Sequence, residues 1–217
     1  MKDKGLLIVI SGFSGAGKGT LMKQMVNRYD RYALSISMTT REPRIGEKHG
    51  REYFFSTKEQ FEDKIKEAGF IEYASYCNNY YGTPKDYVEA KRTEGKDVIL
   101  EIEIQGAMKV KEEYPDAILL FVMPPSAEVL YQRLTGRGTE TKEVIQTRMQ
   151  RAVEESVGIE QYDYIIVNDD LEICVQEMYQ LLALASKEEA EKYKPQYHQE
   201  FIEQIRTQLK CLVKGEK

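Results

Sequence analysis

The chain has 217 residues and a net charge of −5, which suit one α/β domain with insertions and give nucleic acid no general electrostatic attraction. Hydrophobic residues make up 41% of the sequence, and no apolar run approaches the roughly 20 residues that span a membrane. We therefore expect neither a nucleic-acid nor a membrane partner. Any anion site must come from a local group of arginines and lysines.

The numbers and positions of the cysteines and histidines indicate the cellular location and the kinds of metal site to expect. The three cysteines are scattered and form no CxxC pair, which favours free thiols in a reducing cytoplasm. Charged residues at the N-terminus lead directly into a short apolar run, so a signal peptide is not expected. The two histidines are too few to predict a histidine-built metal site. The expected location is cytoplasmic.

Apolar runs alternate with amphipathic stretches along most of the chain. Short aliphatic and β-branched runs predict buried strands, and apolar residues at helical spacing predict helices between them. The predicted strands are residues 6–10, 98–102, 118–122 and 164–167. The predicted helices are residues 17–28, 105–114, 126–134, 144–156 and 171–186. This alternation is typical of a parallel sheet with helices on both faces, in which ligands bind beyond the carboxyl ends of the strands.

The most informative stretch is residues 12–20, Gly-Phe-Ser-Gly-Ala-Gly-Lys-Gly-Thr, which follows the first predicted strand. A strand, a glycine-rich turn and a helix start favour a phosphate-binding loop, because the glycines let backbone N–H groups converge on phosphate oxygens. Lys18 adds a positive charge for the β- and γ-phosphates. The residues expected to bind ATP phosphates are Gly12, Ser14, Gly15, Ala16, Gly17, Lys18, Gly19 and Thr20.

The position after the lysine departs from the usual pattern, in which a serine or threonine holds Mg²⁺. This chain has Gly19 there, and Thr20 follows. We interpret Thr20, or a water molecule bridged to it, as the group that serves the metal. The alternative is a glycine turn without a ligand. It is disfavoured because the strand, the glycines and the lysine all fall in register.

Residues 37–91 interrupt the alternation. They predict extended segments at 51–55 and 70–76, with a short helix between them that a Thr57-x-x-Gln60 capping box begins. We interpret this stretch as a small inserted domain.

Two arginines near the start of the insertion point to a second phosphate. Arg41 and Arg44 are three residues apart around a proline, and guanidinium groups suit bidentate phosphate contacts. Tyr53 and the pair at 80–81 would add hydroxyl donors. The alternative is a solvated basic loop with tyrosines in the core. The phosphate-binding loop elsewhere in the chain favours the functional interpretation.

Several segments, in this order, resemble guanylate kinase. They are residues 37–44, Tyr53, 70–74, 79–83, 102–106 and 133–140. The resemblance extends from about Gly5 to Ala185. It implies a P-loop NTPase core, an inserted nucleoside-monophosphate-binding domain and a mobile lid. The implied boundaries are 1–36 and 92–185 for the core, about 135–157 for the lid, 37–91 for the insertion and 186–217 for a C-terminal helical extension.

The resemblance also implies the activity, which is ATP-dependent phosphorylation of GMP, and of dGMP, with Mg²⁺ in purine nucleotide metabolism. The GMP phosphate would be bound by Ser37, Arg41, Arg44, Tyr53 and Tyr81. Glu72 and Thr83 would read the guanine. Guanine presents N1–H and N2–H₂ as adjacent donors, and one carboxylate accepts from both. Adenine lacks this pair, so AMP would be disfavoured on the order of a thousandfold. The alternative for Glu72 is an exposed strand carboxylate.

Two positions differ from the family's usual residues. The family often has Asp-x-Asp after the insertion, where this chain has Glu101-Ile102-Glu103. Period-two spacing puts both carboxylates on one face of a strand, and each gains a C–C bond of about 1.5 Å. The resemblance implies roles near the guanine, the Mg²⁺ waters or the incoming phosphoryl group. Phe13 replaces a proline, and we expect it at the outer edge of the loop.

The predicted lid supplies arginines for the transferred phosphoryl group, which needs positive charge around its oxygens. Arg137 lies between two glycines, and Arg133 is on the preceding helix. Arg148 is four residues from both Val144 and Ala152 on the predicted apolar face, where a charge is costly unless it meets an anion. Alternatively, Arg148 reaches solvent or pairs with a nearby glutamate. The expected catalytic residues are Lys18, Arg41, Arg133, Arg137 and Arg148.

The predicted reaction is direct in-line transfer, without a protein nucleophile or a general base. Two alternatives remain at this point. One is a related kinase with another acceptor, and the other is a guanylate-kinase-like binding module that has lost catalysis. An apolar stripe at helical spacing in the extension predicts either docking on the chain's own core or a homo-oligomer contact. The stripe consists of Phe201, Ile202, Ile205, Leu209 and Leu212.

Overall fold

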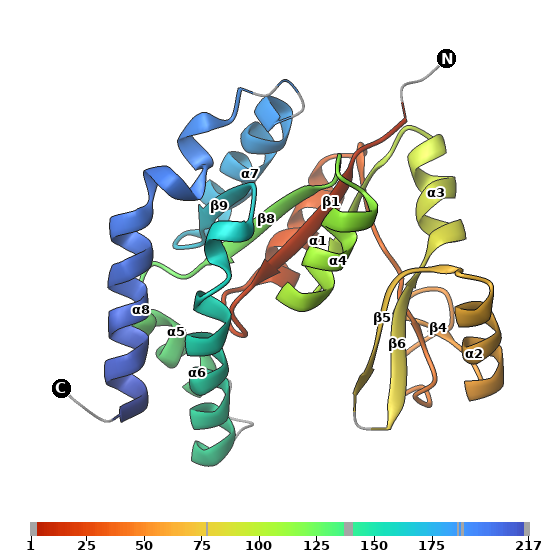
Figure 1. Cartoon of the computed structure of the whole chain (residues 1–217), viewed down its shortest axis with the longest axis horizontal. Helices are drawn as coiled ribbons and strands as arrows, with labels where there is room; N and C mark the ends of the chain where they lie inside the picture. The colour runs from red at the N-terminus through yellow and green to blue at the C-terminus, as the bar shows by residue number, and fades with distance from the viewer. Residues whose placement is uncertain (1–3, 77, 137–140, 186, 188, 215–217) are drawn as a thin grey trace. The chain divides into compact units, whose positions relative to one another are not determined.

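Strand β1 (Leu7–Gly12) joins two compact units of the chain, shown in the computed structural model of Figure 1. The first unit comprises Met1–Val9 and Val26–Ala117, and the second comprises Ile10–Met25 and Ile118–Lys217. The structure describes residues 4–76, 78–136, 141–185, 187 and 189–214.

The first unit contains one side of a five-stranded parallel sheet. Its strands follow the order β2-β7-β1, where β2 is Tyr32–Leu34 and β7 is Asp97–Glu101. Strands β2 and β7 run parallel. The carboxylate of Asp97 is only 1% exposed, yet it accepts hydrogen bonds from the backbone N–H of Leu6 at 2.8 Å and from Arg31 Nε at 2.5 Å. These bonds offset the cost of burying a charge at the start of β7.

A second sheet in the first unit is formed by strands from the predicted insertion. Its order is β4-β3-β6-β5, and β5 and β6 form an antiparallel hairpin. The strands are β3 (Met38–Thr39), β4 (Phe54–Phe55), β5 (Phe70–Tyr76) and β6 (Asn79–Pro84). The helices of this unit are α2 (Lys58–Lys66), α3 (Lys85–Thr93) and α4 (Ile104–Glu113).

Helix α2 is fixed to this sheet by an aromatic cluster. Phe61 is fully buried and stacks on Phe70 and Tyr80, with ring centroids 4.3 and 5.2 Å away. The predicted capping box is confirmed, because Thr57 and Gln60 exchange side-chain and backbone hydrogen bonds at the start of the helix. Figure 1 shows α2 beside the hairpin.

The second unit contains the rest of the parallel sheet, with the order β1-β8-β9. Strand β8 pairs in parallel with β9, so that Leu120 lies opposite Tyr164. Its strands and α-helices are β8 (Ile118–Met123), β9 (Tyr164–Val167), α1 (Lys18–Arg28, whose last turn belongs to the first unit), α5 (Ala127–Thr135), α6 (Lys142–Ser156), α7 (Leu171–Ala185) and α8 (Gln199–Lys214). Short 3₁₀ helices occur at Ile159–Gln161, Glu191–Tyr193 and Pro195–Tyr197.

The predicted α/β class with a parallel sheet is confirmed, and the four predicted strands lie within one or two residues of β1, β7, β8 and β9. Of the extended segment predicted at 51–55, only Phe54–Phe55 is strand, and 51–52 form a turn. The sequence reasoning missed β2, β3, β6 and α3. These elements are short or carry few buried aliphatic residues, so their periodicity is weak. The predicted insertion boundaries stay a prediction, although the second sheet falls inside them.

The C-terminal helix docks on its own unit. Ile202, Ile205 and Leu209 are buried, and α8 packs against α5 and α6. Of the two alternatives for the apolar stripe, docking within the chain is therefore observed for these three residues, while a homo-oligomer through α8 stays a prediction. None of the described helices is both long and apolar enough to cross a membrane.

Candidate active site

The phosphate-binding loop follows β1 in the second unit. Gly12, Gly15 and Gly17 have φ angles of +148°, +97° and +90°, which side-chain-bearing residues rarely adopt. At Gly12 and Gly17, the neighbouring atoms also leave no space for a side chain. A Cβ at Gly12 would lie 2.2 Å from the carbonyl oxygen of Val122, and one at Gly17 would lie 2.4 Å from Asn168 Nδ2. The loop therefore has a conformation that only glycine permits at these positions.

Lys18 begins α1 and lies across the loop. Its ammonium donates to the carbonyl oxygens of Gly12 at 2.7 Å and Phe13 at 3.2 Å. The backbone N–H of Ala16 also donates to the Phe13 oxygen, at 3.0 Å. The positive charge is thus held at the loop and at the N-terminus of a helix, where the helix dipole also favours an anion.

Asn168 braces the loop from β9, and the sequence reasoning missed it. The side chain is 5% exposed, and Nδ2 donates to the carbonyl oxygen of Ala16 at 2.8 Å. Its backbone N–H donates to Met123 at 2.8 Å, which fixes the residue to the end of β8. The available signal was its place just after a strand, at the carboxyl end where ligands bind in such sheets.

Phe13 corrects one prediction. The side chain is fully buried rather than at the outer edge of the loop, and its ring meets Phe121 edge-on at 5.2 Å. Phe121 in turn contacts Tyr162, with centroids 5.1 Å apart. Burial of a large apolar ring outweighs the tendency of loop residues to face solvent. The ring therefore anchors the loop to the core of the second unit.

Arg148 reaches the loop from α6. Its Nη1 donates to Ser14 Oγ at 3.2 Å. The apolar-face argument that singled out this arginine was wrong in part, because Val144 is 42% exposed. The buried face of α6 is formed by neighbouring positions that include Met149 and Ala152. Arg148 lies at the border of that face, and from there it faces the loop.

Arg133 is the second predicted arginine that the structure describes. Its Nη2 donates to the carbonyl oxygen of Asp169 at 3.3 Å, while Nη1 is buried and has no hydrogen-bond partner among the described residues. A buried N–H group without a partner is costly, and an anion would satisfy it. Arg137 lies outside the described residues.

A second candidate site is a cavity of about 430 Å³ in the first unit, a size suited to a small ligand. Six of the predicted GMP-binding residues line it: Ser37, Tyr53, Glu72, Tyr81, Glu101 and Glu103. Lys109 also lines it and was not predicted. These side chains come from β5, β6, the end of β7, helix α4 with its N-cap residue, and the residues just before β3 and β4, so the cavity depends on tertiary structure.

Glu72 is a partly buried carboxylate of this cavity. Its Oε1 accepts a hydrogen bond of 2.9 Å from the hydroxyl of Thr83, which is 2% exposed. Burial raises the pKa of Glu72, and the hydrogen bond from Thr83 and the charge of Lys109 oppose that shift. A Cβ at Gly106 would lie 2.4 Å from Ile102 and 3.6 Å from Glu72 Oε2, so a glycine keeps this side of the carboxylate open. A carboxylate in this setting gains from a ligand that donates hydrogen bonds.

The two arginines predicted to bind the GMP phosphate differ in the structure, and neither lines the cavity. Arg41 Nη2 donates to both carboxylate oxygens of Glu47 at 3.0 Å, and the guanidinium lies 5.4 Å from the ring centroid of Tyr53. Arg44 is exposed, and its backbone N–H donates to Glu47 at 2.8 Å. The guanidinium of Arg41 therefore already binds a two-oxygen anion, although that anion comes from the chain itself. Tyr81 lies beside Tyr53, with centroids 6.1 Å apart.

The same cavity is lined by Glu101 and Glu103, but the two residues do not lie on one face of a strand as predicted. Strand β7 ends at Glu101, and Glu103 is the N-cap residue of α4. They are not successive positions on one strand face, because the chain turns into the helix between them. Both carboxylates are exposed and line the cavity, so their longer side chains have room.

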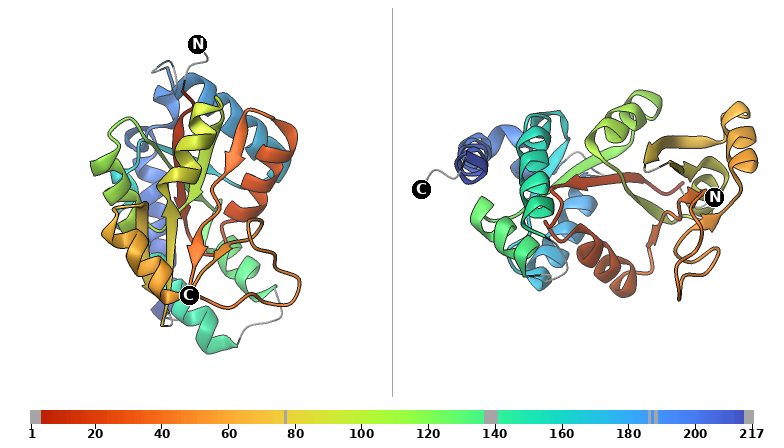
Figure 2. Two further views of the ribbon diagram at one scale, coloured as in Figure 1. Left: turned by 90° about the vertical axis from the view of Figure 1, so that its right-hand side faces the viewer. Right: turned by 90° about the horizontal axis from the view of Figure 1, so that it is seen from below.

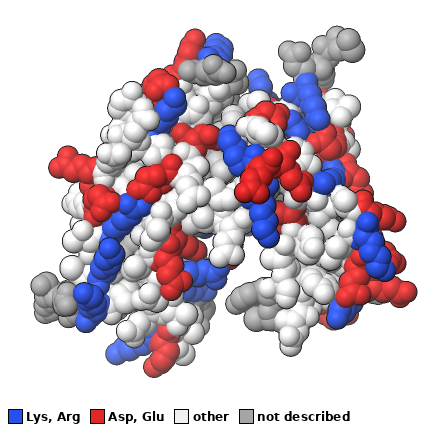
Figure 3. Space-filling model, in the orientation of Figure 1, with Lys and Arg blue, Asp and Glu red and all other residues white. Residues whose placement is uncertain are grey.

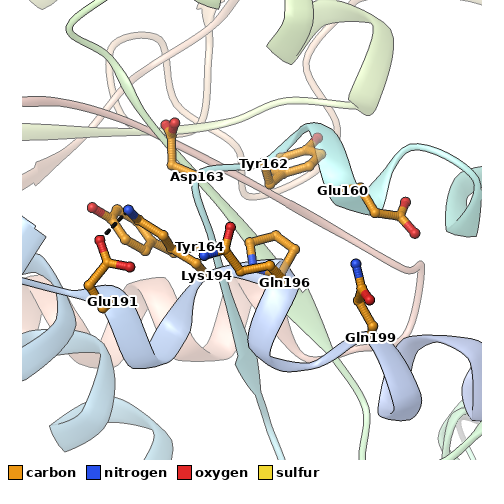
Figure 4. Close-up of a pocket in the computed structure, with 9 residues that line it drawn as sticks. Glu160, Tyr162, Asp163, Tyr164, Glu191, Lys194, Gln196 and Gln199 are labelled. Carbon is orange, nitrogen blue, oxygen red and sulfur yellow. Dashed lines mark hydrogen bonds and ion pairs between the residues drawn. The ribbon is translucent and has the colours of Figure 1, made fainter.

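A larger cavity of about 650 Å³ lies elsewhere in the second unit, between the 3₁₀ helices of the extension and β9 (Figure 4). Its charged groups already pair with one another or with neighbours, as Lys194 does with Glu191 and Glu160 with Arg206. It also lacks a glycine-rich loop. On the molecular face shown in Figure 3, basic and acidic residues are intermixed and form no broad basic area.

The parallel sheet and the loop between β1 and α1 are those of a P-loop NTPase-like protein. A protein-family model described as guanylate kinase matches residues 4–185, and the chain belongs to this family. Its relatives include proteins named guanylate kinase from Clostridium tetani, 50% identical over 83% of this chain and 86% of the relative, and from Clostridium perfringens strain 13, 46% identical over 95% of each. The crystal structure of guanylate kinase from Anaplasma phagocytophilum is similar, with a TM-score of 0.65, 30% identity and coverage of 85% of this chain and 88% of that one.

Proposed function

We propose that this protein is an enzyme that transfers the γ-phosphoryl group of ATP to GMP, and to dGMP, to give ADP and GDP or dGDP. The observation that carries the proposal is the partly buried carboxylate of Glu72, which lines a cavity of nucleotide size and is hydrogen-bonded to the buried Thr83, on a chain that also has a complete phosphate-binding loop. Family membership supports the same reaction. It is a step of purine nucleotide metabolism, and we propose the cytoplasm as its location.

Guanine fits the polarity of Glu72. The base presents two adjacent N–H donors, and an ionised carboxylate accepts both. Adenine lacks this adjacent pair of donors and would leave the partly buried carboxylate without it, which is costly because burial already disfavours the charged group. Thr83 holds the carboxylate in place with its hydroxyl. In this proposal, Glu101 and Glu103 contact the outer part of the nucleotide from the exposed rim of the cavity.

The GMP phosphate would be bound by Arg41, together with Ser37, Tyr53 and Tyr81. The contact of Arg41 Nη2 with both carboxylate oxygens of Glu47 supports this role, because the guanidinium already pairs with an oxyanion in this segment. In the exposed segment, Arg44 would add a second charge. Exchange of the Glu47 carboxylate for a phosphate keeps the arginine paired with an anion.

ATP would bind the loop, with Lys18 on its β- and γ-phosphates and Arg133 and Arg148 on the transferred group. The contact between Arg148 and Ser14 and the unpartnered Nη1 of Arg133 support this assignment. Arg137, which lies outside the described residues, is assigned here only by the family resemblance. A GMP phosphate oxygen attacks the γ-phosphorus in line, and this oxygen is already mostly ionised at neutral pH, so no general base is required.

Mg²⁺ is the metal that this chemistry implies, and it would neutralise charge on the phosphates. Among the described residues, no group of three or more His, Cys, Asp or Glu side chains is arranged to hold a metal. The fit must therefore rest on the hydroxyl of Thr20, which is exposed in the first turn of α1, and on the nucleotide's own oxygens. This matches the usual way in which Mg²⁺ is bound through substrate phosphates.

The test is ADP formation from ATP–Mg²⁺ with GMP, dGMP, AMP, UMP or IMP as acceptor, beside a reaction without acceptor. We expect strong turnover with GMP and dGMP only. Comparable turnover with AMP or UMP would indicate a kinase with another acceptor. Absence of turnover in a folded protein that binds ATP would favour a binding module and contradict the proposal.

A further inference from the structure

Helix α8 lies beyond the residues that the family model matches, yet it packs against two functional helices. Its apolar face contacts α5 and α6, which carry Arg133 and Arg148, respectively. Figure 1 and the right-hand view of Figure 2 both show α8 beside α6. Packing alone would suggest a stabilising role, but the polar residues of α8 make more specific contacts.

Arg206 contacts the end of α6. Its Nε and Nη2 donate to the carbonyl oxygen of Ser156, the last residue of that helix, at 3.0 and 2.5 Å. The last carbonyl groups of a helix have no partner within it and carry partial negative charge, so a guanidinium satisfies both needs. The side chain of Arg206 is 14% exposed, and Glu160 and Glu203 fix it at 2.6 and 2.5 Å. Glu160 is among the residues labelled in Figure 4.

Gln208 contacts the start of α5. Its Oε1 accepts a hydrogen bond of 3.1 Å from the backbone N–H of Ala127, the first residue of that helix. The first N–H groups of a helix also lack partners within it. Ser126 satisfies another of them, that of Val129, at 3.1 Å. Two side chains of α8, two residues apart, therefore hold the end of one arginine-bearing helix and the start of the other.

We infer that α8 is a positioning element for phosphoryl transfer, which sets the directions of α5 and α6 and thereby those of Arg133 and Arg148. The inference rests on the proposed function. Arg148 is two turns before Ser156, about 12 Å along the helix. A change in the direction of α6 at Ser156 therefore moves the guanidinium relative to Ser14 of the loop. Since misplacement by about 1 Å costs up to a hundredfold in rate, the restraint matters for kcat.

The test uses the full-length protein with Arg206→Ala, Arg206→Lys and Gln208→Met, and with Lys210→Ala as the control. Lys210 is an exposed cation of the same helix. We expect Arg206→Ala to lower kcat about tenfold with the KM for GMP unchanged, because the GMP cavity lies in the other unit. Arg206→Lys restores at least half of the lost kcat, since an ammonium also donates to a carbonyl. Gln208→Met lowers kcat a few-fold, and Lys210→Ala leaves it unchanged.

Amide hydrogen exchange separates positioning from general stability. In Arg206→Ala we expect faster exchange at residues 149–156 and unchanged exchange in β8. Unchanged kcat and exchange in Arg206→Ala would overturn the inference. The inference would also be overturned if amide exchange became faster throughout the second unit and both Arg206→Ala and Arg206→Lys lost the same fraction of kcat. That result would indicate a structural role only. A wild-type protein without GMP-dependent turnover would contradict the proposed function instead, and the exchange data would still report whether Arg206 restrains α6.

Discussion

The phosphate-binding loop and the cavity that Glu72 lines are built on opposite principles. In the loop, polar groups satisfy one another, as Lys18 does with backbone carbonyls and Asn168 with Ala16. In the cavity, Glu72 is partly buried and accepts one hydrogen bond that the structure records, from Thr83, and its pKa is raised by burial. The loop is thus organised before a ligand arrives, while the cavity holds a charge that a ligand's donors would stabilise. Under the proposed function, general phosphate binding and base selection are therefore separate properties of the two units.

The largest effect should come from removing the charge of the loop. We predict that Lys18→Met lowers kcat on the order of a thousandfold, because it removes the ammonium that lies on the loop where the charge of the transferred phosphoryl group would develop. The KM for GMP should change little. Steady-state kinetics with ATP–Mg²⁺ measure both constants.

The matched control is Lys23→Met, which removes an exposed lysine of the same helix and should leave kcat unchanged. A loss in Lys18→Met of less than tenfold would mean that the loop's backbone, rather than the ammonium, stabilises the transferred phosphoryl group.

The next effect concerns the cavity. We predict that Glu72→Gln raises the KM for GMP by about a hundredfold or more, because a carboxamide replaces one of two acceptor oxygens with a donor facing the base. ATP binding should be unchanged, as measured by titration with a fluorescent ATP analogue. Glu112→Gln, on the exposed side of α4, is the control. Equal KM values for wild type and Glu72→Gln would refute the base-reading role.

The raised pKa of Glu72 predicts a pH dependence that the loop does not share. GMP binding needs the ionised carboxylate, so the KM for GMP should rise about tenfold per pH unit below the raised pKa, while ATP affinity stays flat.

The stability of the ligand-free protein should change with pH in the opposite direction from GMP binding. Between the unfolded and folded pKa of Glu72, the folded state binds more protons, so the free energy of unfolding falls as pH rises through that window. Glu72→Gln removes this contribution. Thermal unfolding at several pH values checks the prediction, and parallel profiles for wild type and variant would contradict it.

The contrast between the sites also explains what could be predicted from sequence. The loop is one segment whose glycines, lysine and flanking strand encode it locally, so its position was predictable to the residue. The cavity joins strands and a helix distant in the sequence, and apart from Tyr53 and Tyr81 its predicted residues were assigned only through the family resemblance. Asn168, Glu47 and Lys109 were missed because each acts through a partner far along the chain or on another turn. Phe13 was misplaced because its partner Phe121 lies more than a hundred residues away.

The smallest effect tests the unusual residue after the lysine. A Cβ at Gly19 would meet no atom within 4 Å, so Gly19→Ser is sterically permitted. Serine in the first turn of α1 should raise the free energy of unfolding by about 0.5 kcal/mol, because glycine lowers helix stability.

If a hydroxyl at this end of the loop serves Mg²⁺, the Gly19→Ser variant should also need a few-fold less Mg²⁺ for half-maximal rate. The Thr20→Ala variant should need a few-fold more. Titration of Mg²⁺ at fixed ATP and GMP measures both shifts. A Thr20→Ala protein with an unchanged Mg²⁺ requirement would instead place the metal on the nucleotide and water alone, and the loop would contribute only its backbone and Lys18.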